Sequence, residues 1–158
     1  MRLYFLRHAE ALPGEDDAAR PLSQTGKKEA QSLAHFLKNA GVAFDAGFSS
    51  PLVRARQTAE ILLKICGDVS PAELALTEAL QNETSQKAFD RWLKELPEAN
   101  KVLLVGHEPT LSERVRRLLT IASAERLRLP KGGLVCVESE DRRTGCLRFF
   151  VSPKIIAE

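Results

Sequence analysis

The chain has 158 residues, of which 44% are apolar and 28% charged, a composition typical of a globular domain rather than a disordered chain. Its 23 basic and 21 acidic residues leave a formal net charge of +2, which argues against a dedicated nucleic-acid or polyanion-binding protein. The three cysteines, Cys66, Cys136 and Cys146, show no Cys-x-x-Cys spacing. We therefore expect reduced thiols rather than a disulfide framework, a zinc site or a redox motif.

The first strand is expected at residues 3–6, a continuous apolar run typical of a strand covered on both faces. Residues 9–20 form a polar loop with three successive acids, interpreted as solvated. Ser23 is suited to cap the following helix and Gly41 to end it. A partly apolar strand is then expected over residues 42–48.

The next helix is predicted to begin at Ser50-Pro51, with the serine as its cap and the proline in its first turn. The remaining predicted elements are a short strand at residues 72–76, helices at 85–96 and 110–120, a second continuous apolar strand at 102–105, and late strands at 133–137 and 147–151. This alternation of strands and helices predicts an α/β layered sheet.

The expected location is the cytoplasm. The apolar run at residues 3–6 is too short for the core of a signal peptide, and no stretch approaches the ~18 apolar residues that cross a membrane. No repeat, low-complexity tract or flexible linker interrupts the sequence. Residues 1–158 are therefore interpreted as one domain, with a monomer as the default.

Two histidines follow the two fully apolar strands. Ligands of α/β sheets bind beyond the carboxyl ends of the central strands. Residues 3–6 are followed by Arg7-His8, and residues 102–105 by Gly106-His107. If these strands are parallel neighbours, both imidazoles meet at one edge of the sheet.

The helix after Ser50 adds arginines to this edge. Helix N-termini bind anions, and an arginine in the first turn grips phosphate with forked donors. A neutral histidine can attack phosphorus, while a protonated one donates to an oxygen as charge develops. Two histidines with two arginines indicate phosphoryl transfer through a phosphohistidine, without a metal.

Several segments carry a family resemblance. The segment Leu6-Arg7-His8-Ala9-Glu10 resembles the Arg-His-Gly signature of the histidine phosphatase (phosphoglycerate mutase-like) superfamily. Residues 49–59 and 105–109 resemble its second and third motifs, and residues 21–26 the segment before its first helix. Lys131-Gly132-Gly133 before a strand is similar to the small SixA-type phosphohistidine phosphatase branch. The resemblance implies a three-layer α/β/α sandwich whose central sheet is mostly parallel, with helices on both faces.

By position, the resemblance makes His8 the nucleophile and Arg7, Arg54 and His107 the phosphate pocket. Ala9 stands where the family usually has glycine, which adds one methyl beside the nucleophile. The chain also lacks room for the long insertions by which mutase-type members enclose sugar phosphates. An open site of this kind suits a phosphate displayed on a protein surface.

Two positions leave alternatives. Arg54 and Arg56 lie roughly 200° apart around a helix, so only one is expected to face the pocket. Periodicity does not choose between them, and motif position favours Arg54. Mutase and acid-phosphatase members use a carboxylic acid to protonate the leaving oxygen. Glu78 matches that acid best, with Glu83 as the alternative and a surface carboxylate as the other interpretation.

No metal and no cofactor are expected. Glu10 and Glu108 flank the two histidines, but no His-x-x-x-His spacing is present and an adjacent arginine would repel a cation. A second cluster of charge lies on the helix at residues 110–120. It is interpreted as a solvated basic face that could meet an acidic partner protein, and it comprises Arg114, Arg116 and Arg117.

The sequence therefore predicts a phosphohistidine phosphatase that acts on a phosphorylated protein through a covalent phospho-His8 intermediate. A small-molecule phosphomonoesterase on the same scaffold is the alternative, followed by a non-catalytic phosphate-binding adaptor. Inorganic phosphate is an expected ligand. Nucleic acid is not an expected partner, because charge is balanced and aromatic and basic residues do not interleave. A membrane is not expected either, because no apolar stretch is long enough to cross one.

Overall fold

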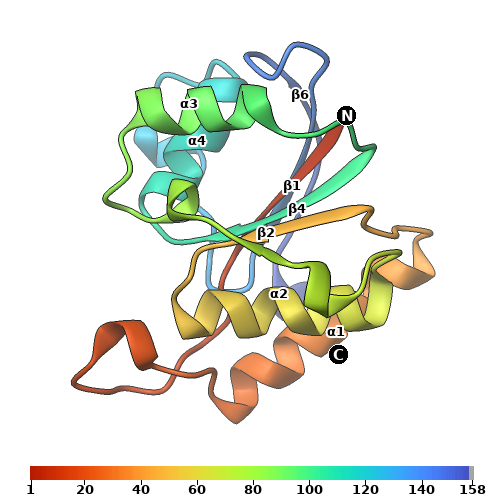
Figure 1. The fold of residues 1–158 in the computed structure, drawn as a ribbon, viewed down its shortest axis with the longest axis vertical. Helices are drawn as coiled ribbons and strands as arrows, with labels where there is room; N and C mark the ends of the chain where they lie inside the picture. The colour runs from red at the N-terminus through yellow and green to blue at the C-terminus, as the bar shows by residue number, and fades with distance from the viewer. Residues whose placement is uncertain (157–158) are drawn as a thin grey trace.

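The computed structural model describes residues 1–156 (Figure 1). Its strands are β1 (Arg2–Arg7), β2 (Ala46–Ser49), β3 (Ala75–Leu76), β4 (Lys101–Gly106), β5 (Leu134–Glu138) and β6 (Cys146–Val151). Its α-helices are α1 (Gln24–Asn39), α2 (Val53–Cys66), α3 (Gln86–Glu95), α4 (Thr110–Leu118) and α5 (Pro153–Ile156). Four short 3₁₀ helices complete it: η1 (Asp17–Ala19), η2 (Pro71–Glu73), η3 (Glu78–Leu80) and η4 (Ala124–Arg126).

The strands form one mixed sheet in the order β3-β2-β4-β1-β5-β6. Strands β3, β2, β4 and β1 run parallel, whereas β5 is antiparallel to β1 and β6 is antiparallel to β5. The antiparallel pair is joined by a short polar turn, while each parallel step requires a helical crossover. The predicted α/β fold with a mostly parallel sheet is confirmed.

Helices cover both faces of this sheet (Figure 1). Along β1, Tyr4 and Leu6 point into a core beneath α1 and α2. Leu3 and Phe5 point into a second core beneath α3 and α4. Because successive side chains of a strand alternate between faces, a strand covered on both sides must be apolar throughout. The continuous apolar runs of the central strands therefore follow from the three-layer α/β/α arrangement, in which helices cover both faces of the sheet.

The helix that carries Arg54 begins later than predicted. Ser50 does not cap it: α2 begins at Val53, and its N-cap residue, Leu52, makes no side-chain capping bond. The Ser50 hydroxyl instead accepts a hydrogen bond from the Leu52 amide at 3.3 Å and lies 2.8 Å from Nε2 of His107. The prediction that Ser50 caps this helix is therefore wrong, because its hydroxyl bonds to His107, the residue that follows β4.

Two predicted strands are shorter than expected. The strand over residues 42–48 is reduced to β2, because Asp45 turns from the sheet to accept bonds from the amides of Asn100 and Lys101. Ala72 and Glu73 instead belong to η2, which Ser70 and Glu73 close with a capping box. Only Ala75–Leu76 pairs as a strand.

The start of α1 is tied to the loop that follows His8. The Ser23 hydroxyl accepts a bond from the Gly26 amide at 3.0 Å and donates to Oε1 of Glu10 at 2.7 Å. A Cβ added at Gly26 would collide with the backbone carbonyl oxygen of Glu10. Ser23 is therefore the N-cap, as predicted, and Gly41, at a φ of 75°, follows the helix end.

In the part of the chain that the structure describes, no helix has the length and apolarity to cross a membrane. Its three cysteines are unpaired: Cys66 and Cys136 are buried and Cys146 is exposed.

The substitution Gly26→Ala should lower the free energy of unfolding by about 2–3 kcal/mol, because the added methyl forces α1 away from the Glu10 backbone. Urea unfolding measures this change. Gln31→Ala, at an exposed position of the same helix, is the matched control. Equal stability of the two variants would contradict the packing described for Gly26.

Candidate active site

The two histidines meet at the carboxyl edge of the central strands. Strands β1 and β4 pair in parallel with Arg7 opposite Gly106, and the His8 amide donates to the Gly106 carbonyl at 3.1 Å. His8 and His107 are the next residues on the two strands. Their rings are buried, with centroids 5.1 Å apart. The parallel pairing expected from the sequence thus places both imidazoles in one site.

A glycine turn holds the backbone of the first motif. The amide of Gly132 donates to the carbonyls of Arg7 and His8, both at 3.1 Å, and the Arg7 amide donates to Gly133 at 3.0 Å. Gly132 has a φ of 70°, a conformation that favours glycine. The Arg7 side chain is directed by its own bond to the Leu129 carbonyl at 3.0 Å.

His8 is held in the protonation state of a nucleophile. Its Nδ1 lies 2.7 Å from the carbonyl oxygen of Ala9. Because a carbonyl only accepts, Nδ1 carries the proton and Nε2 of the neutral ring keeps a lone pair. Burial lowers the pKa of His8 to about 4; the bond to Ala9 opposes this shift, and the charges of Arg54 and Arg7 add to it. The ring is therefore neutral at pH 7.

His107 is positioned by the second motif. Its Nε2 lies 2.8 Å from the Ser50 hydroxyl, while its Nδ1 has no partner among the described residues. Burial lowers its pKa to about 3, and the neighbouring His8 and Arg54 add to this effect. An adjacent phosphate dianion would raise that pKa, because it stabilises the imidazolium form. His107 can then donate to a phosphoryl oxygen.

Arg54 is the arginine of α2 that faces the site. It is buried, and its two Nη atoms donate to the Asp17 carbonyl at 2.7 Å and the Asp17 carboxylate at 3.1 Å. Arg56 is exposed and pairs with Glu60. Sequence periodicity left this choice open, and the packing of α2 against the loop over residues 9–20 decides it.

The loop over residues 9–20 brings two further residues that the sequence reasoning missed. The carboxylate of Asp17 bridges Arg54 and Arg20, whose Nε and Nη2 lie 2.9 and 2.8 Å from Oδ1. Two guanidinium groups thus converge on one anionic group at the mouth of the site. No periodic pattern marks these residues, since they lie in a polar loop. Asp17 is itself the last of the three successive acids that were interpreted as solvated, yet it pairs with Arg54 and Arg20.

Unsatisfied donors concentrate in the site. Within residues 1–156, four buried side-chain nitrogen atoms lack a hydrogen-bond partner, and three of them are Nε of Arg7, Nε of Arg54 and Nδ1 of His107. Leaving a buried polar group unpaired costs about 1–3 kcal/mol, and more for a charged group. Such a cluster, with two guanidinium groups beside an imidazole, is suited to a tetrahedral oxyanion.

Ala9, in the usual glycine position, is accommodated by the core. It is fully buried and packs in the cluster beneath α1 and α2. Its amide donates to the Thr58 hydroxyl at 3.1 Å, and that hydroxyl donates to the Arg54 carbonyl at 2.7 Å. Ala9 therefore joins the loop of His8 to the helix of Arg54.

Glu78 is the first residue of η3, the short helix that follows β3. Its side chain is exposed and forms no hydrogen bond or ion pair with the residues that the structure describes. The same short helix brings the Leu80 carbonyl against Gly106, at the end of β4. Glu83, the alternative, is also exposed. The structure thus brings together His8, Arg7, Arg54 and His107, while the role of Glu78 or Glu83 as general acid stays a prediction.

The two glutamates beside the histidines have structural partners. Glu10 accepts from Ser23, and Glu108 accepts from the amide and hydroxyl of Ser112 at 3.1 and 2.7 Å. Burial raises the pKa of Glu108, and the bonds from Ser112 oppose this shift. Over residues 1–156, no group of three or more His, Cys, Asp or Glu side chains could hold a metal ion.

Comparison with known proteins yields a family match and full-length relatives. Residues 3–82 match the family model of the histidine phosphatase superfamily (branch 1). An uncharacterized protein from Picosynechococcus sp. is 35% identical over 145 residues, covering 88% of this chain and 86% of the relative. A protein of Yersinia pestis named as a probable phosphoglycerate mutase, GpmB, is 26% identical over 161 residues, covering 93% of this chain and 73% of its own.

Solved structures share the fold. The protein histidine phosphatase SixA in complex with tungstate superposes with a TM-score of 0.87 and 23% identity, covering 98% of this chain and 99% of its own. A protein from Agrobacterium tumefaciens, provisionally named phosphohistidine phosphatase SixA, gives a TM-score of 0.78 and 26% identity over 96% of this chain and 97% of its own.

With these relatives, the sandwich fold and the cationic pocket around two histidines define the protein as a phosphatase. The chain belongs to the histidine phosphatase superfamily, branch 1, and has the fold of its SixA-type members. The resemblance found in the sequence motifs is confirmed at the level of family and fold.

Both site histidines should remain neutral in an NMR titration from pH 8 down to pH 5, since their pKa values are lowered to about 4 and about 3. His8→Ala and His107→Ala assign the two imidazole signals. Inorganic phosphate should move the protonation of His107 to higher pH, because the anion stabilises the imidazolium. A transition of either ring near pH ~6.5 without phosphate would refute the electrostatics described here.

Proposed function

We propose that this phosphatase removes phosphate from a phosphorylated histidine on a protein, through a covalent phospho-His8 intermediate and without a metal. One observation carries the proposal: a neutral His8, its Nδ1 bonded to Ala9, lies beside the unpartnered donors of Arg7, Arg54 and His107. A nucleophile and an oxyanion pocket thus occupy the same edge of the sheet.

The first step follows from these positions. Nε2 of His8 attacks phosphorus in line, and the bond between phosphorus and the leaving imidazole breaks as that imidazole takes a proton from solvent. Arg7, Arg54 and His107 hold the equatorial oxygens, whose charge they stabilise. The incoming phosphoryl group displaces the Asp17 carboxylate from Arg54, because both anions require the same guanidinium.

The second step restores the enzyme. Water attacks phosphorus, the bond between phosphorus and Nε2 of His8 breaks, and inorganic phosphate leaves with the oxygen of that water. One water proton is released to solvent or kept by the phosphate, so His8 returns to its neutral form. The Ala9 carbonyl keeps Nδ1 protonated throughout, which leaves Nε2 ready for the next cycle.

A protein substrate is supported by the short chain and by the similarity to SixA, which is known as a protein histidine phosphatase. The labile bond between phosphorus and nitrogen needs little help from a general acid, so this reaction does not depend on the exposed Glu78. Unpaired cysteines suit a reducing cytoplasm. The GpmB relative favours a second candidate, a phosphomonoesterase for small esters, in which Glu78 would protonate the leaving oxygen.

The deciding experiment measures kcat/KM for phosphate release from a phosphohistidine-bearing carrier protein and from p-nitrophenyl phosphate. We expect a large preference for the carrier, loss of turnover in His8→Ala, and no effect of EDTA. A preference for the small ester, slowed about 10²-fold in Glu78→Gln but not in Glu83→Gln, would establish the phosphomonoesterase instead. Phosphate binding without turnover of either substrate would contradict both enzymatic proposals and support a non-catalytic phosphate-binding adaptor.

Arg54→Lys should lower kcat/KM by about 10²-fold, because a lysine ammonium cannot reproduce the forked donors of a guanidinium. Arg56→Lys is the matched control, since Arg56 lies on the same helix but is exposed and pairs with Glu60. Steady-state assays of both variants measure the difference. Equal kcat/KM values in the two variants would show that Arg54 does not bind the phosphoryl group.

A further inference from the structure

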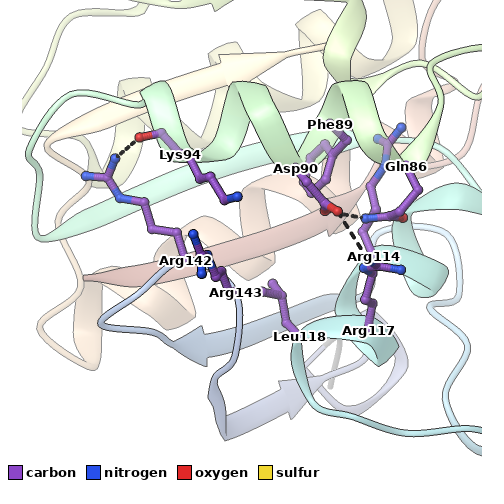
Figure 2. Close-up of a pocket in the computed structure, with 9 residues that line it drawn as sticks. All are labelled: Gln86, Phe89, Asp90, Lys94, Arg114, Arg117, Leu118, Arg142 and Arg143. Carbon is purple, nitrogen blue, oxygen red and sulfur yellow. Dashed lines mark hydrogen bonds and ion pairs between the residues drawn. The ribbon is translucent and has the colours of Figure 1, made fainter.

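A second cationic cavity lies between α3, α4 and the turn that joins β5 to β6, and it shares no lining residue with the histidine site. It has a volume of about 430 Å³ (Figure 2). Glu138, which precedes that turn, pairs with Arg2 at the amino end of β1. His8 follows the carboxyl end of the same strand, so the cavity is separate from the phosphatase site.

Hydrogen bonds join the three walls. Arg142 in the turn donates to the carbonyls of Lys94 and Leu96, at 2.8 and 2.6 Å, at the end of α3. The Gly145 amide donates to the Leu118 carbonyl of α4 at 2.9 Å. The cavity is therefore a preformed part of the fold, within the usual size range of small-molecule sites.

The charge that lines the cavity is strongly positive. Its cationic side chains are Lys94, Arg114, Arg117, Arg142 and Arg143, and its one carboxylate is Asp90. Asp90 is shared between Arg117, at 3.4 Å, and the Gln86 amide, and Arg142 pairs with Glu98 outside the cavity. The side chains of Lys94 and Arg143 have no partner among residues 1–156.

Arg114 departs from the sequence-based interpretation. It was expected on a solvated basic face, yet it is 1% exposed. Its helical position explains this, since Leu111 precedes it by three residues and Leu118 follows it by four, which places all three on the buried face. The expectation of a solvated Arg114 is therefore wrong.

The environment of Arg114 leaves its charge without a paired anion. The guanidinium lies 4.3 Å from the centre of the Phe89 ring, and its Nη2 donates to the carbonyls of Gln81 and Thr84 at 3.1 and 3.3 Å. No carboxylate forms an ion pair with it among the described residues. Burial lowers its pKa to about 10, and the charges of Glu113 and Asp90 oppose this shift. A buried cation without a directly paired anion is costly, and a bound anion would offset that cost.

The same feature marks the phosphatase site. Of the four buried side-chain nitrogens without a partner in the described chain, three lie around the two histidines and the fourth is Nη1 of Arg114. Figure 2 shows Arg142 and Arg143 at one end of the cavity and Arg117 at the other, with the Lys94 side chain extending between them. Cations thus approach the cavity from all three elements that form its walls.

We propose that this cavity is a second anion-binding site, for a small molecule that carries at least two phosphate or carboxylate charges. Lys94 and Arg143 contact its anionic groups, and Arg114 contributes the buried positive charge. The size and walled shape of the cavity favour a small ligand over an extended acidic peptide. Charge-assisted contacts from three elements supply the affinity.

NMR of the ¹⁵N-labelled protein, titrated with pyrophosphate at about 0.15 M salt, separates the two sites by the amides that shift. We expect saturable shifts in α3, the end of α4 and the turn around Arg143, in addition to those around His8. In Lys94→Gln/Arg143→Gln, the affinity reported by the cavity amides should fall at least about tenfold, while the shifts around His8 persist.

The matched control is Arg56→Gln/Lys64→Gln, which removes two exposed charges from α2 and should leave both affinities unchanged. A parallel titration with citrate distinguishes carboxylate from phosphate ligands, and binding of either supports the site. Shifts confined to the histidine site, equal weakening in both double variants, or binding of polyglutamate without pyrophosphate or citrate would overturn the proposal.

Discussion

The parallel pairing of β1 with β4 is the constraint on which the site depends. Their register sets Arg7 opposite Gly106, so the next residue on each strand is a histidine at the same edge of the sheet. Both strands are buried on both faces, which removes any freedom to slide without exposing apolar side chains. The cores that stabilise the sandwich thereby also fix the spacing of the two imidazoles.

Burial then gives these groups their chemical character. Water is excluded around the histidines, so the pKa of each ring is lowered and both are neutral at pH 7. Arginine keeps its charge when buried, and Arg7 and Arg54 retain donors without partners. The neutral nucleophile His8 therefore lies beside the permanent positive charges of Arg7 and Arg54. Arg114 shows the same combination of burial and an unpaired donor in the second cationic cavity.

Sequence patterns performed well where one local rule controlled the outcome. The continuous apolar runs predicted central strands, and Ser23 was correctly identified as the cap of α1. They failed where distant partners compete for a residue. Ser50 satisfies the rule for a helix cap, but the ring of His107, which arrives from another strand, takes its hydroxyl. Arg114 satisfies the rule for a surface charge, yet Phe89 of the neighbouring helix stacks on it.

By itself, the sequence determined the α/β class, the two strand-end histidines and the family motifs, because hydrophobic period and motif order are local properties of the chain. Only the tertiary structure decided that Arg54 rather than Arg56 faces the site, since that choice depends on which side of α2 packs on the loop bearing Asp17. It alone brought together the side chains that line the second cationic cavity. Both depend on contacts between segments far apart in the chain, and no local pattern encodes such contacts.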